Sequence, residues 1–250
     1  MKQRLDVLLT AQGLATSRSQ AESWIKMGKV LVDGRAVEKP GVFISTSARL
    51  ELKAEEKYVS RAGLKLSSVA RELQLDFNDQ VVLDVGSSTG GFTDFALKHG
   101  AQKVIAVDVG TNQLHPSLRG NPKVELHEQT DIRDVVLQVA TPGQVAIAAP
   151  DIVVIDVSFI SLRDILPHIA TLCRPNTRVV AMFKPQFETG SKQKHKGVIK
   201  NDTMRRDILH DFENWVKKLF IIRNKADSEV AGSKGNRERF YMLQLTRSSR

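Results

Sequence analysis

The chain has 250 residues, of which 41% are hydrophobic and 26% are charged, as in an ordinary soluble globular protein. Its net charge of +9 favours a polyanionic partner, with nucleic acid before an anionic membrane surface. The single cysteine, Cys173, excludes an internal disulfide, and the six histidines lack metal-ligand spacing, so we predict no metal site.

The N-terminal stretch "MKQRLDVLLTAQ" has neither the apolar core nor the cleavage site of a signal peptide. Leu5, Leu8 and Leu9 share one face of a first helix, which Gly13 ends. Ser17 is suited to cap a second helix, with Gln20 completing a capping box. "VLVDGRAV", residues 30–37, then predicts a β-hairpin. No later segment reaches the length of a membrane helix, so we expect a cytoplasmic protein. We also expect a monomer.

Through "RLD" and "SRSQAESWIKMGKVLVDG", the first domain resembles, over about fifty residues, the small α+β RNA-binding domain first known from ribosomal protein S4. With its short linker this domain is expected to span residues 1–58. The resemblance implies contact with phosphates and RNA shape, because few exposed aromatic residues are expected for stacking on bases. A generic small domain with a basic face is the alternative. The basic candidates for RNA binding are Arg4, Arg18, Lys26, Lys29 and Arg35.

After a charged linker, "KAEEK" at residues 53–57, a second domain is expected over residues 59–250. Five apolar strands separated by helical stretches predict a Rossmann-like α/β sheet with helices on both faces. A further helix is expected from Asn201, followed by two strands that form an antiparallel pair, "FIIRNKA" and "RFYMLQL". The five strands are "QVVLDV", "KVIAVDV", "KVELHE", "DIVVIDV" and "RVVAMF".

The glycine-rich stretch "LDVGSSTGGFTD", residues 83–94, follows the first of these strands. Its glycines permit a sharp turn and a close approach to a ligand, and a helix is expected to begin there. Parallel sheets bind ligands beyond the carboxyl ends of their strands. The spacing departs from Gly-x-Gly-x-x-Gly, so a pyrophosphate fits less well, and a purely structural turn stays open.

Three acidic residues at successive strand ends indicate the ligand. Asp84 suits a cationic aminoacyl group, Asp108 is placed for ribose hydroxyls, and Asp131 is placed for an adenine amino group with Ile132 beside the ring. This order favours S-adenosylmethionine over NAD. The predicted cofactor-binding residues are Asp84, Gly86, Ser87, Ser88, Gly90, Gly91, Phe92, Thr93, Asp108, Asp131 and Ile132.

The next two strands end in Asp156 and Lys184. A lysine directly after an apolar strand suggests chemistry, although a lysine that extends its amine into solvent is the alternative. "SRAGLKL", "LDVGSSTGGFTD", "AVDVGTNQL", "DVSFISL", "KPQFE" and "GNRERF" together resemble the TlyA family of ribosomal RNA methyltransferases, relatives of the FtsJ-type ribose methylases.

The resemblance implies that the chain 2′-O-methylates cytidine ribose in ribosomal RNA of one or both subunits, with S-adenosylmethionine as cofactor. The family's Lys-Asp-Lys-Glu tetrad falls on Lys65, Asp156, Lys184 and Glu238. We expect Lys184 to accept the hydroxyl proton, Asp156 to orient the lysines, and Glu238 to hold Lys65 or the ribose. In one departure, Ala231–Gly232 stands where the family usually has a Ser-Pro pair.

The C-terminal part of the chain is strongly basic, with 15 Lys and Arg against 7 Asp and Glu in residues 191–250. We expect "TGSKQKHKGVIK" to contact RNA phosphates through Lys192, Lys194 and Lys196, and Arg61 is a further RNA-binding candidate. Three alternatives stay open: a noncatalytic RNA-binding or ribosome-assembly factor, a base methylase, and a membrane-active hemolysin, a label that relatives carry.

Overall fold

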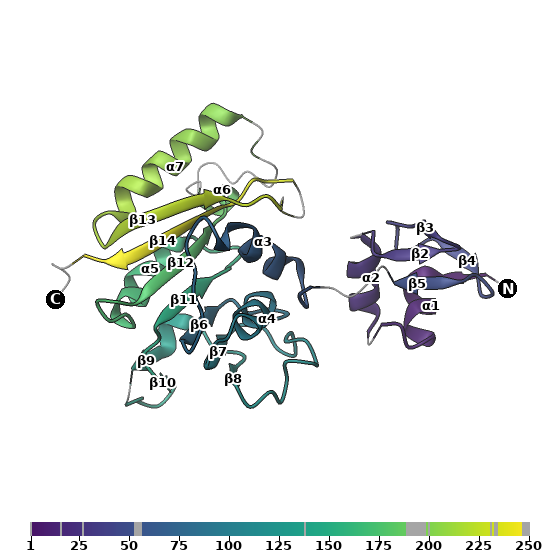
Figure 1. The fold of residues 1–250 in the computed structure, drawn as a ribbon, viewed down its shortest axis with the longest axis horizontal. Helices are drawn as coiled ribbons and strands as arrows, with labels where there is room; N and C mark the ends of the chain where they lie inside the picture. The colour runs from purple at the N-terminus through teal and green to yellow at the C-terminus, as the bar shows by residue number, and fades with distance from the viewer. Residues whose placement is uncertain are drawn as a thin grey trace. The chain divides into compact units, whose positions relative to one another are not determined.

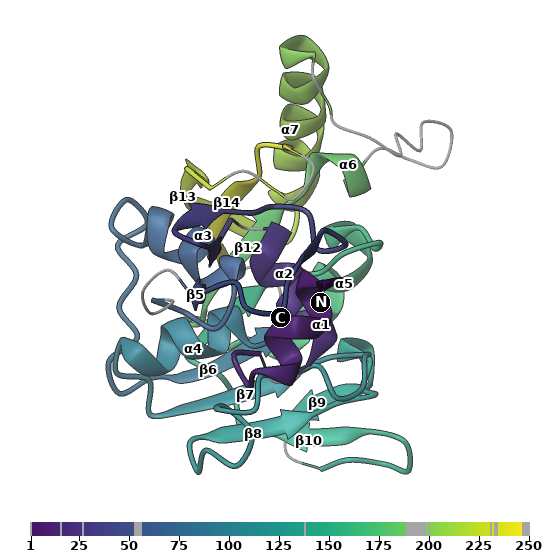
Figure 2. The same ribbon diagram turned by 90° about the vertical axis from the view of Figure 1, so that its right-hand side faces the viewer.

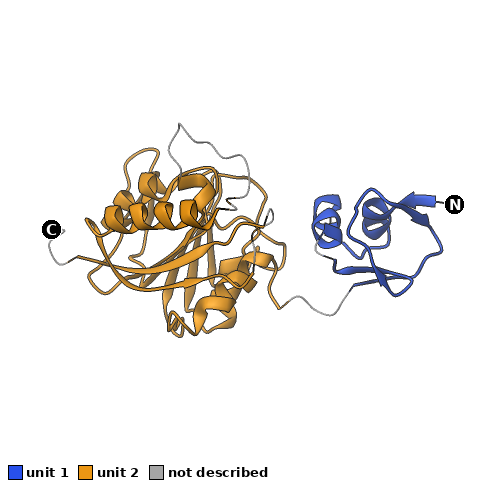
Figure 3. Cartoon of the chain, turned by 90° about the horizontal axis from the view of Figure 1, so that it is seen from above, with its two compact units in different colours: residues 1–56 blue, residues 57–250 orange. Residues whose placement is uncertain are grey.

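The computed structural model describes residues 2–15, 17–26, 28–52, 57–137, 139–188, 199, 201–230, 232 and 235–246. The chain forms two compact units, residues 1–56 and 57–250 (Figure 3). Residues 53–56 of the predicted linker lie outside the described part.

The first unit contains both helices and the hairpin predicted for it. Ser17 accepts a hydrogen bond from the Gln20 amide at 3.2 Å, and Gly13 after the first helix has φ +72°. β2 pairs antiparallel with β3 and β5, and β1 pairs antiparallel with β4, so the ribbon of β1 and β4 is an addition to the prediction. The elements are β1 (Lys2–Arg4), α1 (Leu5–Ala11), α2 (Arg18–Lys26), β2 (Val30–Val32), β3 (Arg35–Ala36), β4 (Phe43–Ser45) and β5 (Leu50–Leu52).

The second unit is built on a seven-stranded sheet with the order β13-β14-β12-β11-β6-β7-β8 (Figure 1). The five predicted strands run parallel, and the last two form the predicted antiparallel pair, with β14 next to β12. The strands are β6 (Val81–Val85), β7 (Lys103–Val107), β8 (Val124–His127), β11 (Ile152–Ile155), β12 (Arg178–Phe183), β13 (Phe220–Asp227) and β14 (Arg239–Leu245).

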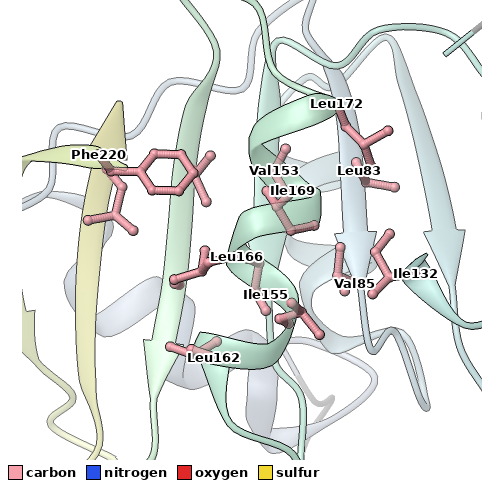
Figure 4. Close-up of a cluster of buried hydrophobic side chains, with 14 of the residues drawn as sticks. Leu83, Val85, Ile132, Val153, Ile155, Leu162, Leu166, Ile169, Leu172 and Phe220 are labelled. Atoms are coloured by element: carbon pink, nitrogen blue, oxygen red, sulfur yellow. The ribbon is translucent and has the colours of Figure 1, made fainter. Parts of the chain in front are cut away.

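Helices cover both faces of this sheet (Figures 1 and 2). α3 (Arg61–Ala70) and α4 (Gly91–Lys98) pack against one face, with Val82 and Val154, while α5 (Leu162–Thr171) and α7 (Asp202–Val216) pack against the other, with Leu83 and Val153. Successive residues of a strand point to opposite faces, so the apolar strands supply both cores. Figure 4 shows the α5 core, in which Leu166 and Ile169 lie over Val153 and Ile155.

The predicted alternation of strand and helix is wrong in two places. Residues 108–123, between β7 and β8, contain no helix, because Pro116, Gly120 and Pro122 interrupt the segment. Between β8 and β11 the chain forms only the 3-10 helix η1 (Ile132–Asp134) and a small parallel pair, β9 (Val135–Leu137) and β10 (Val145–Ile147).

The helix expected from Asn201 is confirmed as α7. The Asn201 side chain accepts a hydrogen bond from the Met204 amide at 3.0 Å, and Phe212 and Val216 are buried. Leu219 packs against the same core after the helix has ended. The short helix α6 (Pro185–Glu188) follows β12 directly, so the chain turns sharply after Lys184.

Candidate active site

Lys184 and Asp156 form an ion pair at the carboxyl ends of two adjacent parallel strands, β12 and β11. The Lys184 Nζ lies 2.6 Å from Asp156 Oδ1 and donates a hydrogen bond to Ser158 Oγ at 2.8 Å. Only 10% of the Lys184 side chain is exposed, so its charge is largely removed from water and depends on the nearby carboxylate for compensation.

A second ion pair joins Lys65, on α3, to Glu238, directly before β14. The Lys65 Nζ lies 2.5 Å from Glu238 Oε2, and 4% of the Glu238 side chain is exposed. Gly232, in the departure from the family pattern, borders this carboxylate, since a β-carbon at position 232 would lie 2.9 Å from Glu238 Oε1. The missing side chain therefore leaves room for Glu238.

Both ion pairs lie at the same edge of the sheet. Phe183, the last residue of β12, pairs with Arg239, the first residue of β14. Lys184 follows Phe183 and Glu238 precedes Arg239, so both lie next to this pair. A β-carbon at Gly86 would lie 2.7 Å from the Asp156 carbonyl oxygen. The glycine-rich turn after β6 therefore contacts the backbone that carries the first pair.

The turn itself needs glycine at defined points. Gly86 has φ +78° and Gly90 has φ +89°, a left-handed conformation that side chains disfavour. Gly90 is the N-cap of α4, as the sequence predicts. At Gly91 a β-carbon would lie 2.2 Å from Ser60 Oγ and 2.8 Å from the Gly63 nitrogen, so the start of α3 packs directly on the start of α4.

Asp84 is completely buried behind the turn, on the α4 face of the sheet. Its Oδ2 accepts a 2.6 Å hydrogen bond from Thr93 Oγ1, and burial raises the pKa of Asp84 to about 7 against the lowering effect of that bond. Asp84 Oδ1 and Ser87 Oγ are buried without a hydrogen-bond partner among the described residues. Phe92 is also buried, with its ring beside Phe240. Phe92 and Thr93 therefore belong to the buried interior next to the turn.

Asp108 links the glycine-rich turn to the next strand end. Its Oδ2 accepts from the Ser88 amide at 2.8 Å and its Oδ1 from the Gly110 amide at 2.7 Å. Each carboxylate oxygen retains a lone pair for a further donor, such as a ribose hydroxyl. The Thr130 amide donates to the Asp108 carbonyl at 3.0 Å, which holds the loop after β8 beside this site.

The Asp131 carboxylate, directly before η1, is paired with Arg133, which the sequence did not predict. Arg133 Nε and NH2 donate to Asp131 Oδ1 and Oδ2 at 2.9 and 2.6 Å, and this pairing lowers the pKa of Asp131. Ile132 is 6% exposed and belongs to the α5 core. An adenine amino group would therefore share Asp131 with a guanidinium.

This arrangement fits an adenosyl cofactor with a cationic amino-acid end. Two buried oxygens, Asp84 Oδ1 and Ser87 Oγ, lack partners among the described residues, and an unsatisfied buried acceptor costs free energy. A donor group reaching them would recover that cost. At the neighbouring strand end, Asp108 is half-buried and retains acceptor capacity.

The predicted RNA-binding residues of the first unit have different surroundings. Arg4 and Arg18 both pair with the buried Asp6, Lys26 lies 3.8 Å from Glu22, Lys29 is half-buried, and Arg35 is exposed. In the second unit, Arg61 is the first residue of α3. Lys192, Lys194 and Lys196 lie outside the described residues.

Four residues at this edge of the sheet were not identified from the sequence: Ser158, Phe159, Phe187 and Glu188. Phe159 is 93% exposed with φ +68°, and its ring centroid lies 5.3 Å from that of Phe187. Glu188 accepts from Ser161 Oγ at 2.6 Å and from the Leu162 amide at 2.8 Å, which ties the segment after Lys184 to the start of α5. The motifs "DVSFISL" and "KPQFE" contain these residues. The sequence alone does not show which of their side chains are exposed or which groups they contact, because both depend on the tertiary structure.

A model of the FtsJ-like methyltransferase family matches residues 58–245, and the S4 domain matches residues 3–50. The chain belongs to the FtsJ-like methyltransferase family. A protein of Mycobacterium tuberculosis named 16S/23S rRNA (cytidine-2′-O)-methyltransferase TlyA is 38% identical over 96% of this chain and 89% of its own length. The predicted resemblance to the TlyA family is thus confirmed.

Two further proteins are similar over nearly the whole chain. A Bacillus subtilis protein described as a candidate rRNA methyltransferase is 40% identical over 98% of this chain and 85% of its own length. A solved structure of a hemolysin candidate from Streptococcus thermophilus is 39% identical, covers 99% of this chain and 90% of its own, and has a TM-score of 0.74. Both the methyltransferase name and the hemolysin name therefore occur among relatives of this fold.

None of the helices that the structure describes is long and apolar enough to cross a membrane. Within the same residues, no group of three or more His, Cys, Asp and Glu side chains is arranged to hold a metal ion.

Proposed function

We propose that this protein methylates the 2′-hydroxyl of cytidine in ribosomal RNA, with S-adenosylmethionine as the methyl donor. The observation that carries the proposal is the Lys184–Asp156 ion pair beside the glycine-rich turn, with the Lys65–Glu238 pair at the same edge. The relative from M. tuberculosis is named for this reaction on 16S and 23S rRNA, and we extend both substrates to this chain as part of the proposal.

The cofactor would be held by the turn and by the next two strand ends. Asp84 and Ser87 would accept from its ammonium group, Asp108 from its ribose, and the Asp131–Ile132 segment would border its adenine. When bound, S-adenosylmethionine supplies a methyl group on a sulfonium, which a hydroxyl oxygen can attack. Glycine at positions 86 and 90 lets the turn pack closely on its neighbours, since a β-carbon would lie 2.7 Å from the Asp156 carbonyl oxygen and 2.4 Å from Leu118 Cδ1.

Lys184 would position the ribose hydroxyl and take its proton. The ammonium form already donates to Ser158, and Asp156 holds the amine in place, which supports orientation of the hydroxyl as its first task. Positioning of this kind can lower a barrier by about 7–11 kcal/mol. Proton acceptance requires the neutral form of the amine. The Lys65–Glu238 pair, at the same edge of the sheet, would help to hold the ribose.

The surroundings of the site suit a nucleotide of single-stranded RNA. Phe159, exposed beside Ser158, offers a ring face at the site, and base–aromatic stacking does not depend on sequence. The net charge of +9 and the S4 domain support a polyanionic substrate. Because the four paired groups are amines and carboxylates, they suit proton transfer from a hydroxyl more directly than attack on a carbon of a base.

The test is transfer of labelled methyl from S-adenosylmethionine to isolated small subunits, large subunits and whole ribosomes. Lys184→Ala should abolish transfer and leave cofactor affinity, measured by calorimetry, nearly unchanged. Lys184→Arg retains the cation but cannot act as a base. If it keeps normal turnover, Lys184 acts by charge alone and the proposed proton transfer is wrong.

A matched control is available in β13. Lys225 forms a similar ion pair with Glu213 at 2.8 Å in another part of the sheet, and Lys225→Ala should retain full activity. Nucleoside mass spectrometry after nuclease digestion locates the methyl group on ribose or base. Binding without transfer would indicate an RNA-binding or assembly factor. Leakage of liposomes would instead support the hemolysin alternative.

A further inference from the structure

The ribbon of β1 and β4 in the first unit presents an exposed aromatic residue among basic side chains. Arg4 lies directly opposite Phe43, and Lys2 lies opposite Ser45, so these four side chains share one face. Phe43 is 64% exposed, and Lys2 and Ser45 are exposed as well. Ile44, on the other face, packs against the core of the unit, which fixes the orientation of the ribbon.

A buried carboxylate, Asp6, holds both Arg4, which lies opposite Phe43, and Arg18. Arg4 donates to both oxygens of Asp6, at 3.0 and 2.7 Å, and Arg18 Nε donates to Asp6 Oδ2 at 2.9 Å. Asp6 is 0% exposed, whereas 38% of the Arg4 side chain and 56% of the Arg18 side chain are exposed. One negative charge thus orients two positive charges, and a net positive charge faces outward.

The orientation of Arg4 is fixed further by the backbone that leads into β4. A β-carbon at Gly41 would lie 3.4 Å from Arg4 NH1, so the guanidinium lies against the backbone two residues before Phe43. An arginine held in this way loses little conformational entropy when it binds a phosphate, because its geometry is already set. We call Lys2, Arg4, Arg18 and Phe43 the Phe43 strip.

We propose that the Phe43 strip binds a single-stranded segment of RNA, with Phe43 stacked on one unpaired base and the cations on the flanking phosphates. The inference rests on the proposed RNA substrate and adds a contact that depends on an unpaired base. The sequence led us to expect few exposed aromatic residues for stacking in the first unit, and Phe43 is one that the structure shows.

Charge favours RNA over the other occupants of such a surface. Lys2, Arg4 and Arg18 contribute three positive charges, of which Asp6 balances one. Glu22 lies 3.7 Å from Arg18 and is shared with Lys26 at 3.8 Å, so the net charge of the group stays positive. A second copy of the chain would bring two such strips together and repel itself. An RNA strand presents phosphates for the cations and base faces for the ring, which is the combination used by single-strand-binding surfaces.

The test uses the full-length protein and two RNA probes. One is a stem-loop with 2-aminopurine at successive unpaired loop positions, and the other is a blunt duplex of similar composition. Phe43→Ala should bind the stem-loop about 5- to 100-fold more weakly and leave duplex binding nearly unchanged. Quenching of 2-aminopurine by the wild-type protein at one loop position should be lost in the variant.

Three variants separate stacking from other effects. Phe43→Trp should retain affinity, whereas Phe43→Leu, which is apolar but not aromatic, should behave like Phe43→Ala. Arg4→Gln should reduce the logarithmic salt slope by about 0.7 for a single-strand contact, which Phe43→Ala should not. Val139→Ala removes an apolar side chain that is 84% exposed in the second unit and should change nothing.

Several results would overturn the proposal. Equal binding of both probes by wild type and Phe43→Ala excludes stacking at this position. Weaker binding to intact ribosomal subunits, without any change for naked RNA, points to a protein partner, and a shift in sedimentation points to self-association. This binding test does not depend on catalysis. If the wild-type protein transferred no methyl group, the proposed function would be refuted, but RNA binding by the Phe43 strip could still be tested with the same two probes.

Discussion

The buried carboxyl group of Asp84 predicts that stability falls as pH rises. Its pKa of about 7 in the folded protein compares with an ordinary value of 3.8, a difference of about 3 units. Between these values the folded state holds a proton that the unfolded state has released. The free energy of unfolding should therefore fall by ~1.4 kcal/mol per pH unit through this window, and level off above pH 7.

Because the group is completely buried, solvent screening does not reduce this effect. Integrated from pH 5 to pH 8, the contribution is about 2.5 kcal/mol, present at the lower pH and lost at the higher. Asp84→Asn cannot ionise and retains an oxygen to accept from Thr93. The difference in unfolding free energy between wild type and Asp84→Asn should therefore change by this amount across the window.

Urea denaturation at several pH values measures the effect. Trp24 lies in the first unit and Trp215 in the second, so a Trp24→Phe background lets tryptophan fluorescence report on the unit that holds Asp84. The exposed Asp207, changed to Asn, serves as the control and should follow the wild type. Parallel pH profiles for wild type and Asp84→Asn would refute the reasoning that burial keeps this carboxyl group protonated.

Two further predictions concern packing and charge at the site. Gly91→Ala would place a methyl 2.2 Å from Ser60 Oγ and 2.8 Å from the Gly63 nitrogen. Its melting temperature should therefore fall more than that of Gly120→Ala, which meets nothing within 4 Å and carries only the backbone strain of a φ of +77°. Lys65→Met leaves Glu238 buried without its cation and should cost about 3–5 kcal/mol, much of which the double variant with Glu238→Gln should recover. The two single variants and the double variant form a double-mutant cycle, measured by urea denaturation. Additive changes in the free energy of unfolding would show that Lys65 and Glu238 are not coupled.

The sequence predicts the sheet well because its strands are continuous apolar runs that end in polar or glycine residues. These runs need no tertiary information, and the five parallel strands and the final antiparallel pair are confirmed. The segment between β7 and β8 was predicted incorrectly, since only its prolines and glycine, and not its apolar content, show that no helix forms. The β1–β4 ribbon has strands of only three residues, too short for a periodic pattern.

The candidate site shows a similar limit. The motifs lead to Lys65, Asp156, Lys184 and Glu238, and the topology brings their strand ends to one edge. The sequence does not show which side chains pair with one another in the folded protein. Asp131 could have faced a ligand alone, but Arg133, two residues away, reaches it, and Asp84 faces inward to Thr93. The left-handed backbone and exposure of Phe159 likewise depend on the folded loop.

The position of β14 has a consequence for protein synthesis. This strand lies between β12 and β13, although it is made after both, and the residue before it is the partner of Lys65. A chain emerging from the ribosome therefore carries its glycine turn long before residues 235–246 arrive to fill the gap in the sheet. Until then Lys65 lacks its counter-ion, so this ion pair can form only after nearly the whole chain has been synthesised.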